Sequence, residues 1–142
     1  MVTVQQIFDA AMDLMDEQDE NTGSTKTTDT REYQLRTISI LNIAINALFP
    51  YSSNYDTSAS GRPAALVLLL DDRKNPDFGQ TIYLDDGLCW ALLPFFLASL
   101  LRSSEDTEFS MRMMTEYNGA LANLKNGVLS EFEKIETPYG LF

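Results

Sequence analysis

From Gly87 to Leu101 the sequence contains no charged side chain. A helix over these residues is apolar on nearly every side, so the rest of the chain has to surround it. The stretch is shorter than the roughly 20 apolar residues that span a bilayer, and we expect no membrane association. It therefore predicts an all-α fold, a bundle of about four helices around a buried central helix.

The chain has 142 residues, which is the size of one domain with a hydrophobic core of its own. We expect a single helical domain over 1–142, with loops at 18–28 and 51–63 and a C-terminal tail at 137–142. The single cysteine, Cys89, excludes an internal disulfide and is typical of a small buried hydrophobe. The first residues lack the basic and apolar segments of a signal peptide, so we expect the chain in the cytoplasm.

The first helix is predicted to begin at Thr3, with Gln6 three residues later completing a capping box. Its apolar face alternates with an acidic one, whose members are Asp9, Asp13, Asp16, Glu17 and Glu20. Like charges four residues apart destabilise a helix, as do acids near its C-terminus. The acidic face is therefore either a contact for a basic partner or a solvated surface.

A second helix is predicted from Asp29 to Phe49, where Pro50 stops it. Asn42 and Asn46 form a narrow polar line along an otherwise apolar segment. Both side chains need hydrogen-bond partners if they are buried. They lie either against a neighbouring chain or in a groove open to water.

The segment 64–84 contains two short apolar runs, at 64–70 and 81–84, separated by a turn-rich stretch. The two runs predict either a short β-hairpin or an extra helical turn, because periodicity does not separate these over so few residues.

In the central helix, Asp85 or Asp86 is the expected N-cap. Small residues that recur every three or four positions predict a close approach of another helix, and Pro94 predicts a kink. The stripe of small residues is Gly87, Ala91, Pro94 and Ala98. The predicted structural core comprises Trp90, Leu93, Pro94, Phe96 and Leu97 from this helix and Tyr117 and Leu121 from the last one.

The last helix is predicted to start at Ser103 or Ser104 and to run to Glu136, with a weak point at Asn126-Gly127. Beyond it the tail 137–142 ends in aromatic and aliphatic residues, and it is either a docking segment or a frayed terminus. Its candidate interaction residues are Tyr139, Leu141 and Phe142.

The chain lacks the residues that most enzymes and metal sites use. It contains no histidine, one cysteine and none of the common glycine-rich phosphate-binding motifs. We therefore predict no catalytic residues, no metal and no cofactor. Twenty-one acidic residues against ten basic ones give a net charge of -11, which disfavours nucleic acids and favours protein partners.

Four sequence segments resemble a known family. They are Leu-Asp-Asp-Gly-Leu at 84–88, Ala-Leu-Leu-Pro-Phe-Phe-Leu-Ala at 91–98, Glu-Asp at 105–106 and Arg-Met-Met-Thr-Glu-Tyr-Asn-Gly-Ala-Leu at 112–121. In their order, these segments resemble the small head-tail connector proteins of tailed bacteriophages, also called adaptor or head-completion proteins. The chain departs from that pattern at Phe96 and Leu97, where the family commonly has small residues.

The resemblance implies a mostly helical, non-enzymatic subunit. Such subunits form a homo-oligomeric ring between the portal protein and a tail-completion protein, and DNA passes through the channel. It implies a place in the virion neck, after assembly in the host bacterial cytoplasm. A second hypothesis, drawn from the charge alone, is an acidic cytoplasmic regulatory or inhibitor protein that binds a basic protein partner.

Overall fold

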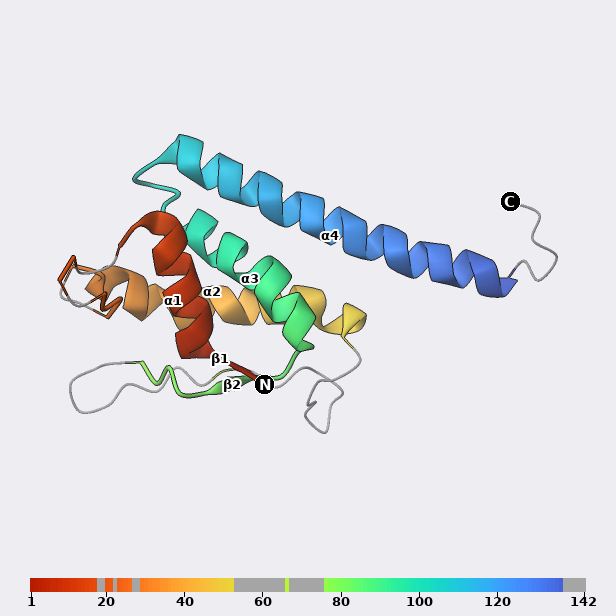
Figure 1. The fold of residues 1–142 in the computed structure, drawn as a ribbon, viewed down its shortest axis with the longest axis horizontal. Helices are drawn as coiled ribbons and strands as arrows, with labels where there is room; N and C mark the ends of the chain where they lie inside the picture. Colours follow the sequence, from red (N-terminus) through yellow and green to blue (C-terminus); the bar gives the residue numbers. More distant parts are fainter. Residues whose placement is uncertain (18–19, 22, 27–28, 53–65, 67–75, 137–142) are drawn as a thin grey trace.

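The computed structural model describes residues 1–17, 20–21, 23–26, 29–52, 66 and 76–136, the last stretch, 126–136, as helical backbone only. Its elements are β1 (Val2–Thr3), α1 (Val4–Met15), α2 (Arg31–Leu48), the 3-10 turn η1 (Phe49–Tyr51), β2 (Thr81–Ile82), α3 (Asp86–Leu101) and α4 (Thr107–Glu136). The predicted all-α fold is confirmed (Figure 1).

Helix α3 is the centre of the bundle, and it contacts α1, α2 and α4. Figure 1 shows α4 along one side of α3, with α1 and α2 on the side away from α4. The buried residues of α3 are Leu88, Cys89, Leu92, Leu93, Pro94, Leu97, Ala98, Ser99 and Leu101. Burying each large apolar side chain contributes about 1.5 to 3 kcal/mol, so α3 contributes much of the apolar burial that stabilises the fold.

Helix α1 begins with the predicted capping box. The Thr3 side chain accepts a hydrogen bond from the Gln6 backbone N–H, and the Gln6 side chain accepts one from the Thr3 backbone N–H. The helix then buries one face, which consists of Val4, Ile7, Phe8, Ala11, Met12 and Met15. The Phe8 ring lies 4.9 Å from the Phe78 ring, centroid to centroid, so this face also holds the segment before β2.

The short strand β2 pairs with the N-terminus. Val2 lies opposite Ile82 and Thr3 opposite Thr81, in an antiparallel pair. The pairing continues into α1, because the Val4 backbone N–H donates to the Gln80 carbonyl at 3.0 Å. Part of the 81–84 run thus forms a strand, as the hairpin alternative predicts. This strand pairs with β1. Most of the other predicted arm, 64–70, lies outside the described residues.

The Asn42 side chain has a partner within the chain. Its amide donates to the Leu66 carbonyl at 3.1 Å, and its side-chain oxygen accepts from the Leu66 N–H at 2.8 Å. Asn42 therefore needs no neighbouring chain to satisfy its hydrogen bonds. Asn46 is exposed and donates to the Asn42 carbonyl one turn earlier.

Of the three remaining helix starts, two differ from the predicted ones. Helix α2 has Thr30 as its N-cap in place of Asp29. Asp85 is the N-cap of α3, as predicted, although its side chain makes no capping hydrogen bond. Helix α4 begins at Thr107, because the Asp106 carboxylate accepts from the Phe109 N–H at 3.0 Å. The predicted start at Ser103 or Ser104 is wrong, since residues 102–105 form the turn between α3 and α4.

The prediction that Trp90 belongs to the core is also wrong, because this side chain is 47% exposed. Gly87 and Ala91 beside it are exposed, so the predicted small-residue stripe is buried only at Pro94 and Ala98. The neighbouring helices leave this part of the first turns of α3 uncovered. Of the other predicted core residues, Leu93, Pro94, Leu97 and Tyr117 are buried, and Phe96 and Leu121 are partly buried against the core.

The sequence predicts a kink at Pro94 and a weak spot or bend at Asn126-Gly127. Helix α3 runs without interruption through Pro94, and the backbone of α4 is helical through Asn126-Gly127. Helix α4 has 30 residues and is about 45 Å long at 1.5 Å per residue. In Figure 1 it continues well past the ends of the other helices.

Candidate protein-interaction surfaces and their polar support

The predicted acidic face of α1 is divided between internal and exposed positions. The Asp9 carboxylate accepts hydrogen bonds from the Gln5 side chain at 2.7 Å and from the Thr25 hydroxyl at 2.5 Å. Thr25 is buried, and its carbonyl accepts from the buried Thr30 hydroxyl at 2.7 Å. Asp9 therefore holds the segment 23–26 against α1 and does not only face solvent.

Glu17 is also used within the chain, in an ion pair with Arg102. Asp13, Asp16 and Glu20 are exposed. Asp16 has a φ of 57° and ends α1 in the left-handed conformation. The exposed part of the acidic face is thus smaller than the sequence pattern indicates. The candidate tail residues Tyr139, Leu141 and Phe142 lie outside the described residues.

Replacing Asp9 with alanine is expected to lower the free energy of unfolding by about 1 to 2 kcal/mol, because two hydrogen bonds to a carboxylate are lost. Urea unfolding measures the change, and hydrogen exchange at 23–26 reports the release of this segment. Glu20→Ala is the matched control, since that exposed acid should contribute less than about 0.5 kcal/mol. Equal changes in the two variants would show that Asp9 is only a solvated charge.

Trp90 forms one wall of a shallow groove of about 240 Å³ between α1 and α3. The other lining residues are Gln6, Asp9, Ala10 and Asp13. This groove places an exposed indole beside two carboxylates, an arrangement that suits the stem and charge of a lysine or arginine side chain. Gly87 and Ala91, which predicted a close approach of another helix, are exposed on the same part of α3.

A larger open depression of about 680 Å³ follows the first turns of α4. It is lined by Thr107, Glu108, Met111, Arg112, Met113, Thr115 and Glu116. Met111 is 65% exposed, whereas Met113 packs partly against the core. The depression therefore offers an adaptable apolar side chain within a rim of charged and hydroxyl groups.

The outward face of α2 is uncharged over most of its length. No charged residue occurs between Thr37 and Ser52. Ile43 is 61% exposed and Leu35 is 41% exposed, with exposed Ser39 between them in sequence. Exposed Glu32 lies one turn before Leu35, so the part of this face without carboxylates begins at Thr37.

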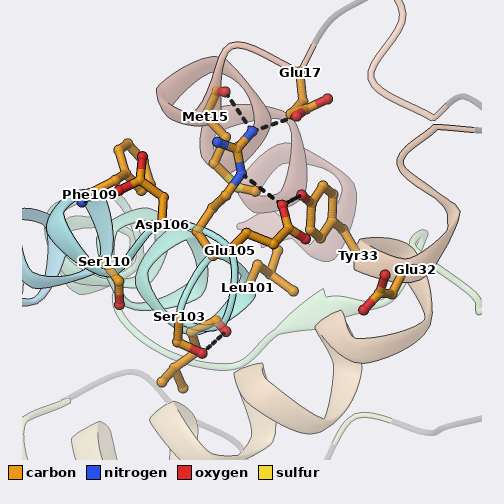
Figure 2. A network of polar contacts seen from close by, with 12 residues as sticks. Met15, Glu17, Glu32, Tyr33, Leu101, Ser103, Glu105, Asp106, Phe109 and Ser110 are labelled. Carbon is orange, nitrogen blue, oxygen red and sulfur yellow. Dashed lines mark hydrogen bonds and ion pairs between the residues drawn. The ribbon is translucent and has the colours of Figure 1, made fainter.

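Arg102, at the end of α3, contacts groups of α1 and α4 and, through Glu105, Tyr33 of α2. Figure 2 shows the labelled members of this network, Met15, Glu17, Tyr33, Glu105 and Phe109. The Arg102 Nη2 donates to the Met15 carbonyl at the end of α1, at 3.1 Å, and pairs with Glu17. Its Nε lies 3.7 Å from the Glu105 carboxylate, which also accepts from the Tyr33 hydroxyl of α2 at 2.6 Å. The guanidinium carbon lies 5.8 Å from the centroid of the Phe109 ring of α4. A cation at the C-terminus of α1 also interacts favourably with the helix dipole.

Arg36 donates hydrogen bonds to carbonyl groups at the C-terminus of α3, as Arg102 does at the C-terminus of α1. Its guanidinium donates to the Leu100 carbonyl at 3.0 Å and to the Leu101 carbonyl at 3.4 Å. The C-terminal carbonyls of α1 and α3 thus each meet an arginine from a different element.

Burial and neighbouring charges shift the pKa values of two groups in this network, Tyr33 and Arg102. Burial, followed by the hydrogen bond to Glu105, raises the pKa of Tyr33. Burial by itself lowers the pKa of Arg102, but interactions with Tyr33, Glu17 and Glu105 raise it overall. Both groups therefore keep their protons at neutral pH, and neither Tyr33 nor Arg102 is poised to exchange a proton there.

Cys89 is fully buried, as the sequence predicts, and burial together with Asp86 and Asp85 raises the pKa of its thiol to about 12. The neutral thiol is favoured in the folded state, so its contribution to stability is complete below the ordinary pKa of 9.0 and is lost between pH 9 and 12. We expect unfolding free energies to fall by up to about 1.4 kcal/mol per pH unit in that range.

Urea unfolding between pH 8 and 10 tests this expectation. Cys89→Ala should flatten the profile above pH 9. The pKa values of Tyr33 and Tyr117 are also raised from 10.0 by burial, so their contributions decline only at higher pH. An unchanged slope in Cys89→Ala would show that the thiol does not cause the decline.

The part of the chain that the structure describes contains no group of three or more histidine, cysteine, aspartate or glutamate side chains placed to hold a metal ion. Among the described helices, none combines the length and apolarity needed to cross a membrane. Comparisons with protein-family models, with curated proteins and with solved structures gave no match for this chain.

Proposed function

We propose that this chain is a non-enzymatic head-tail connector subunit of a tailed bacteriophage, which forms a ring between portal and tail during virion assembly. The observation that carries the proposal is the position of the residues that resemble this family. The segments at 84–88, 91–98, 105–106 and 112–121 fall in α3, in the first half of α4 and in the residues directly before each helix, and α3 and α4 pack against each other. The residues that carry the resemblance thus belong to two helices that pack together as one structural unit.

The shape of α4 supports the proposal. A subunit in a ring needs two different surfaces, one for each neighbour. Helix α4 continues past the rest of the bundle in Figure 1, and it offers backbone length on which a neighbouring subunit can pack. The partners are further copies of the chain, the portal protein and a tail-completion protein, in the virion neck and, before that, in the host cytoplasm.

The charge of the chain fits the passage of DNA through such a ring. A net charge of -11 repels phosphate groups, so DNA is not held as it moves through the channel. The chain itself has no catalytic role and binds no cofactor in this proposal.

Electron microscopy of the protein mixed with its portal tests the proposal. We expect rings of the chain seated on the portal. A protein that stays monomeric and binds neither portal nor tail-completion protein would contradict it.

A second candidate, an acidic regulatory protein that binds a basic partner, is favoured by the groove at Trp90. There an exposed indole lies beside Asp9 and Asp13. Pull-down from a host lysate would recover a basic protein, and Trp90→Ala would weaken its capture. The two candidates separate cleanly, because this one requires no association with virions.

A further inference from the structure

Two hollows share the same pair of carboxylates on α1. Asp9 and Asp13 line the shallow groove at Trp90, and they also line a second open hollow of about 430 Å³. The second hollow is completed by the segment 23–26 and contains Lys26. Among the described residues, the lining of the groove at Trp90 includes no basic side chain. The carboxylate pair therefore meets a cation in one hollow and an exposed indole in the other.

The charge of the surrounding sequence favours a basic occupant for this groove. Residues 1–30 contain seven carboxylate side chains and one basic side chain, that of Lys26. The Lys26 Nζ lies 5.0 Å from the centroid of the Phe78 ring, so this cation already interacts with another aromatic side chain. The net charge of -11 disfavours a second copy of the chain and a nucleic acid. Charge complementarity thus identifies the occupant as part of a basic protein.

The Asp9 carboxylate is fixed in position and can still accept a hydrogen bond. Gln5 and Thr25 both donate to the same oxygen, Oδ1, at 2.7 Å and 2.5 Å. A carboxylate accepts through both of its oxygens, so Oδ2 has capacity for a charge-assisted hydrogen bond. Because Asp9 is already held by two donors, it loses little conformational freedom when a further donor binds.

The size and the walls of the groove favour a single arginine side chain. Its volume of about 240 Å³ is below the roughly 300 to 1,000 Å³ of small-molecule sites, so it suits one long side chain of a partner. Trp90 is 47% exposed and offers an aromatic surface. A planar guanidinium stacks on such a surface while its N–H groups donate to carboxylates, whereas the ammonium of lysine is a compact and strongly hydrated charge.

We propose that the groove formed by Trp90, Asp9 and Asp13 binds an arginine side chain of a basic protein segment. The guanidinium stacks on the Trp90 indole and donates hydrogen bonds to the two carboxylates. The inference rests on the second candidate function for the existence of a basic partner. It adds which side chain of that partner is recognised.

Intrinsic fluorescence of the full chain tests the site, because Trp90 is the only tryptophan in the sequence. The protein is titrated with a blocked peptide of alternating arginine and glycine, and with the same peptide carrying lysine in place of arginine. We expect a saturable change in indole emission and an affinity at least about threefold higher for the arginine peptide. Equal affinities, or no change in emission up to about 1 mM peptide, would overturn the proposal.

Two variants with the same change in charge separate the groove from general attraction. Asp13→Asn removes a carboxylate that lines the groove, whereas Asp16→Asn removes an exposed one that does not. Asparagine tolerates the left-handed conformation of Asp16, so this control should fold normally. Asp13→Asn should weaken binding of the arginine peptide at least about threefold, and Asp16→Asn less than about 1.5-fold, at unchanged thermal midpoints. Equal weakening would overturn the proposal.

Trp90→Ala provides a measurement that does not depend on the carboxylates. Calorimetry should show binding of the arginine peptide weakened at least about fivefold, and full binding by this variant would overturn the proposal.

The same variant distinguishes the groove from the second candidate function. Arginine peptide bound through Trp90, with no basic protein recovered from a host lysate, would refute the second candidate and leave the arginine site standing. A basic protein captured equally by Trp90→Ala and by the wild type would refute the site and leave the second candidate standing.

Discussion

Replacing Leu97 with alanine is expected to lower the free energy of unfolding by about 3 to 5 kcal/mol. Leu97 has no exposed surface and lies on α3, which contacts all the other helices. Truncation removes buried methyl groups and leaves a cavity, because neighbouring helices relax only in part. Urea unfolding monitored by far-ultraviolet circular dichroism measures the loss.

Trp90→Ala is the control within the same helix. The indole is 47% exposed, so its removal should change the free energy of unfolding by less than about 1 kcal/mol. In a core position, the loss of a tryptophan costs about 3 to 5 kcal/mol. A larger effect for Trp90→Ala than for Leu97→Ala would therefore mean that α3 turns the Trp90 side chain, and not Leu97, toward the core.

Local patterns predicted the main elements of the fold correctly. The uncharged run from Gly87 to Leu101 indicated a central helix, because only a surrounded helix tolerates so few polar groups. The capping box at Thr3 and Gln6 marked the start of α1, since both of its hydrogen bonds form within four residues. Such local patterns predict structure because the residues that form them are close in sequence.

The sequence pattern does not predict which side of α3 is buried and which side is exposed. A helix that is apolar on all sides has no hydrophobic face to indicate which direction is buried, and Trp90 was therefore assigned to the core. Its actual exposure depends on how far α1 and α4 extend over α3, which is a tertiary property. The sequence also does not predict the β1–β2 pair, because a strand as short as Val2–Thr3 shows no alternation of apolar and polar residues.

The sequence does not predict the polar contacts of the candidate surfaces, because the partner residues are far apart in the chain. Glu17 and Arg102 are 85 positions apart, and Asp9 and Thr25 are 16 apart. The sequence showed an acidic helix face, but it did not show that Asp9 and Glu17 have partners within the chain. The uncharged face of α2 was visible as a run without charges, whereas the exposure of Ile43 required the structure.

Replacing Arg102 with methionine is expected to lower the free energy of unfolding by about 2 to 3 kcal/mol. The methionine keeps most of the apolar stem but removes the guanidinium. Glu17 then loses its ion pair and the Met15 carbonyl loses its hydrogen bond. Unpaired groups that stay partly buried are costly, so the loss exceeds that of a surface salt bridge.

Arg36→Met is the matched control, because Arg36 also caps a helix C-terminus but is more exposed, at 38% of its side chain against 18% for Arg102. It should cost about 0.3 to 1 kcal/mol, the range for an exposed cation at a helix C-terminus. A double-mutant cycle of Arg102→Met with Tyr33→Phe should give a coupling of at least about 0.5 kcal/mol, since both side chains contact Glu105. Additive effects would mean that Tyr33 and Arg102 stabilise the bundle independently, and that the four helix ends are not held by one connected network.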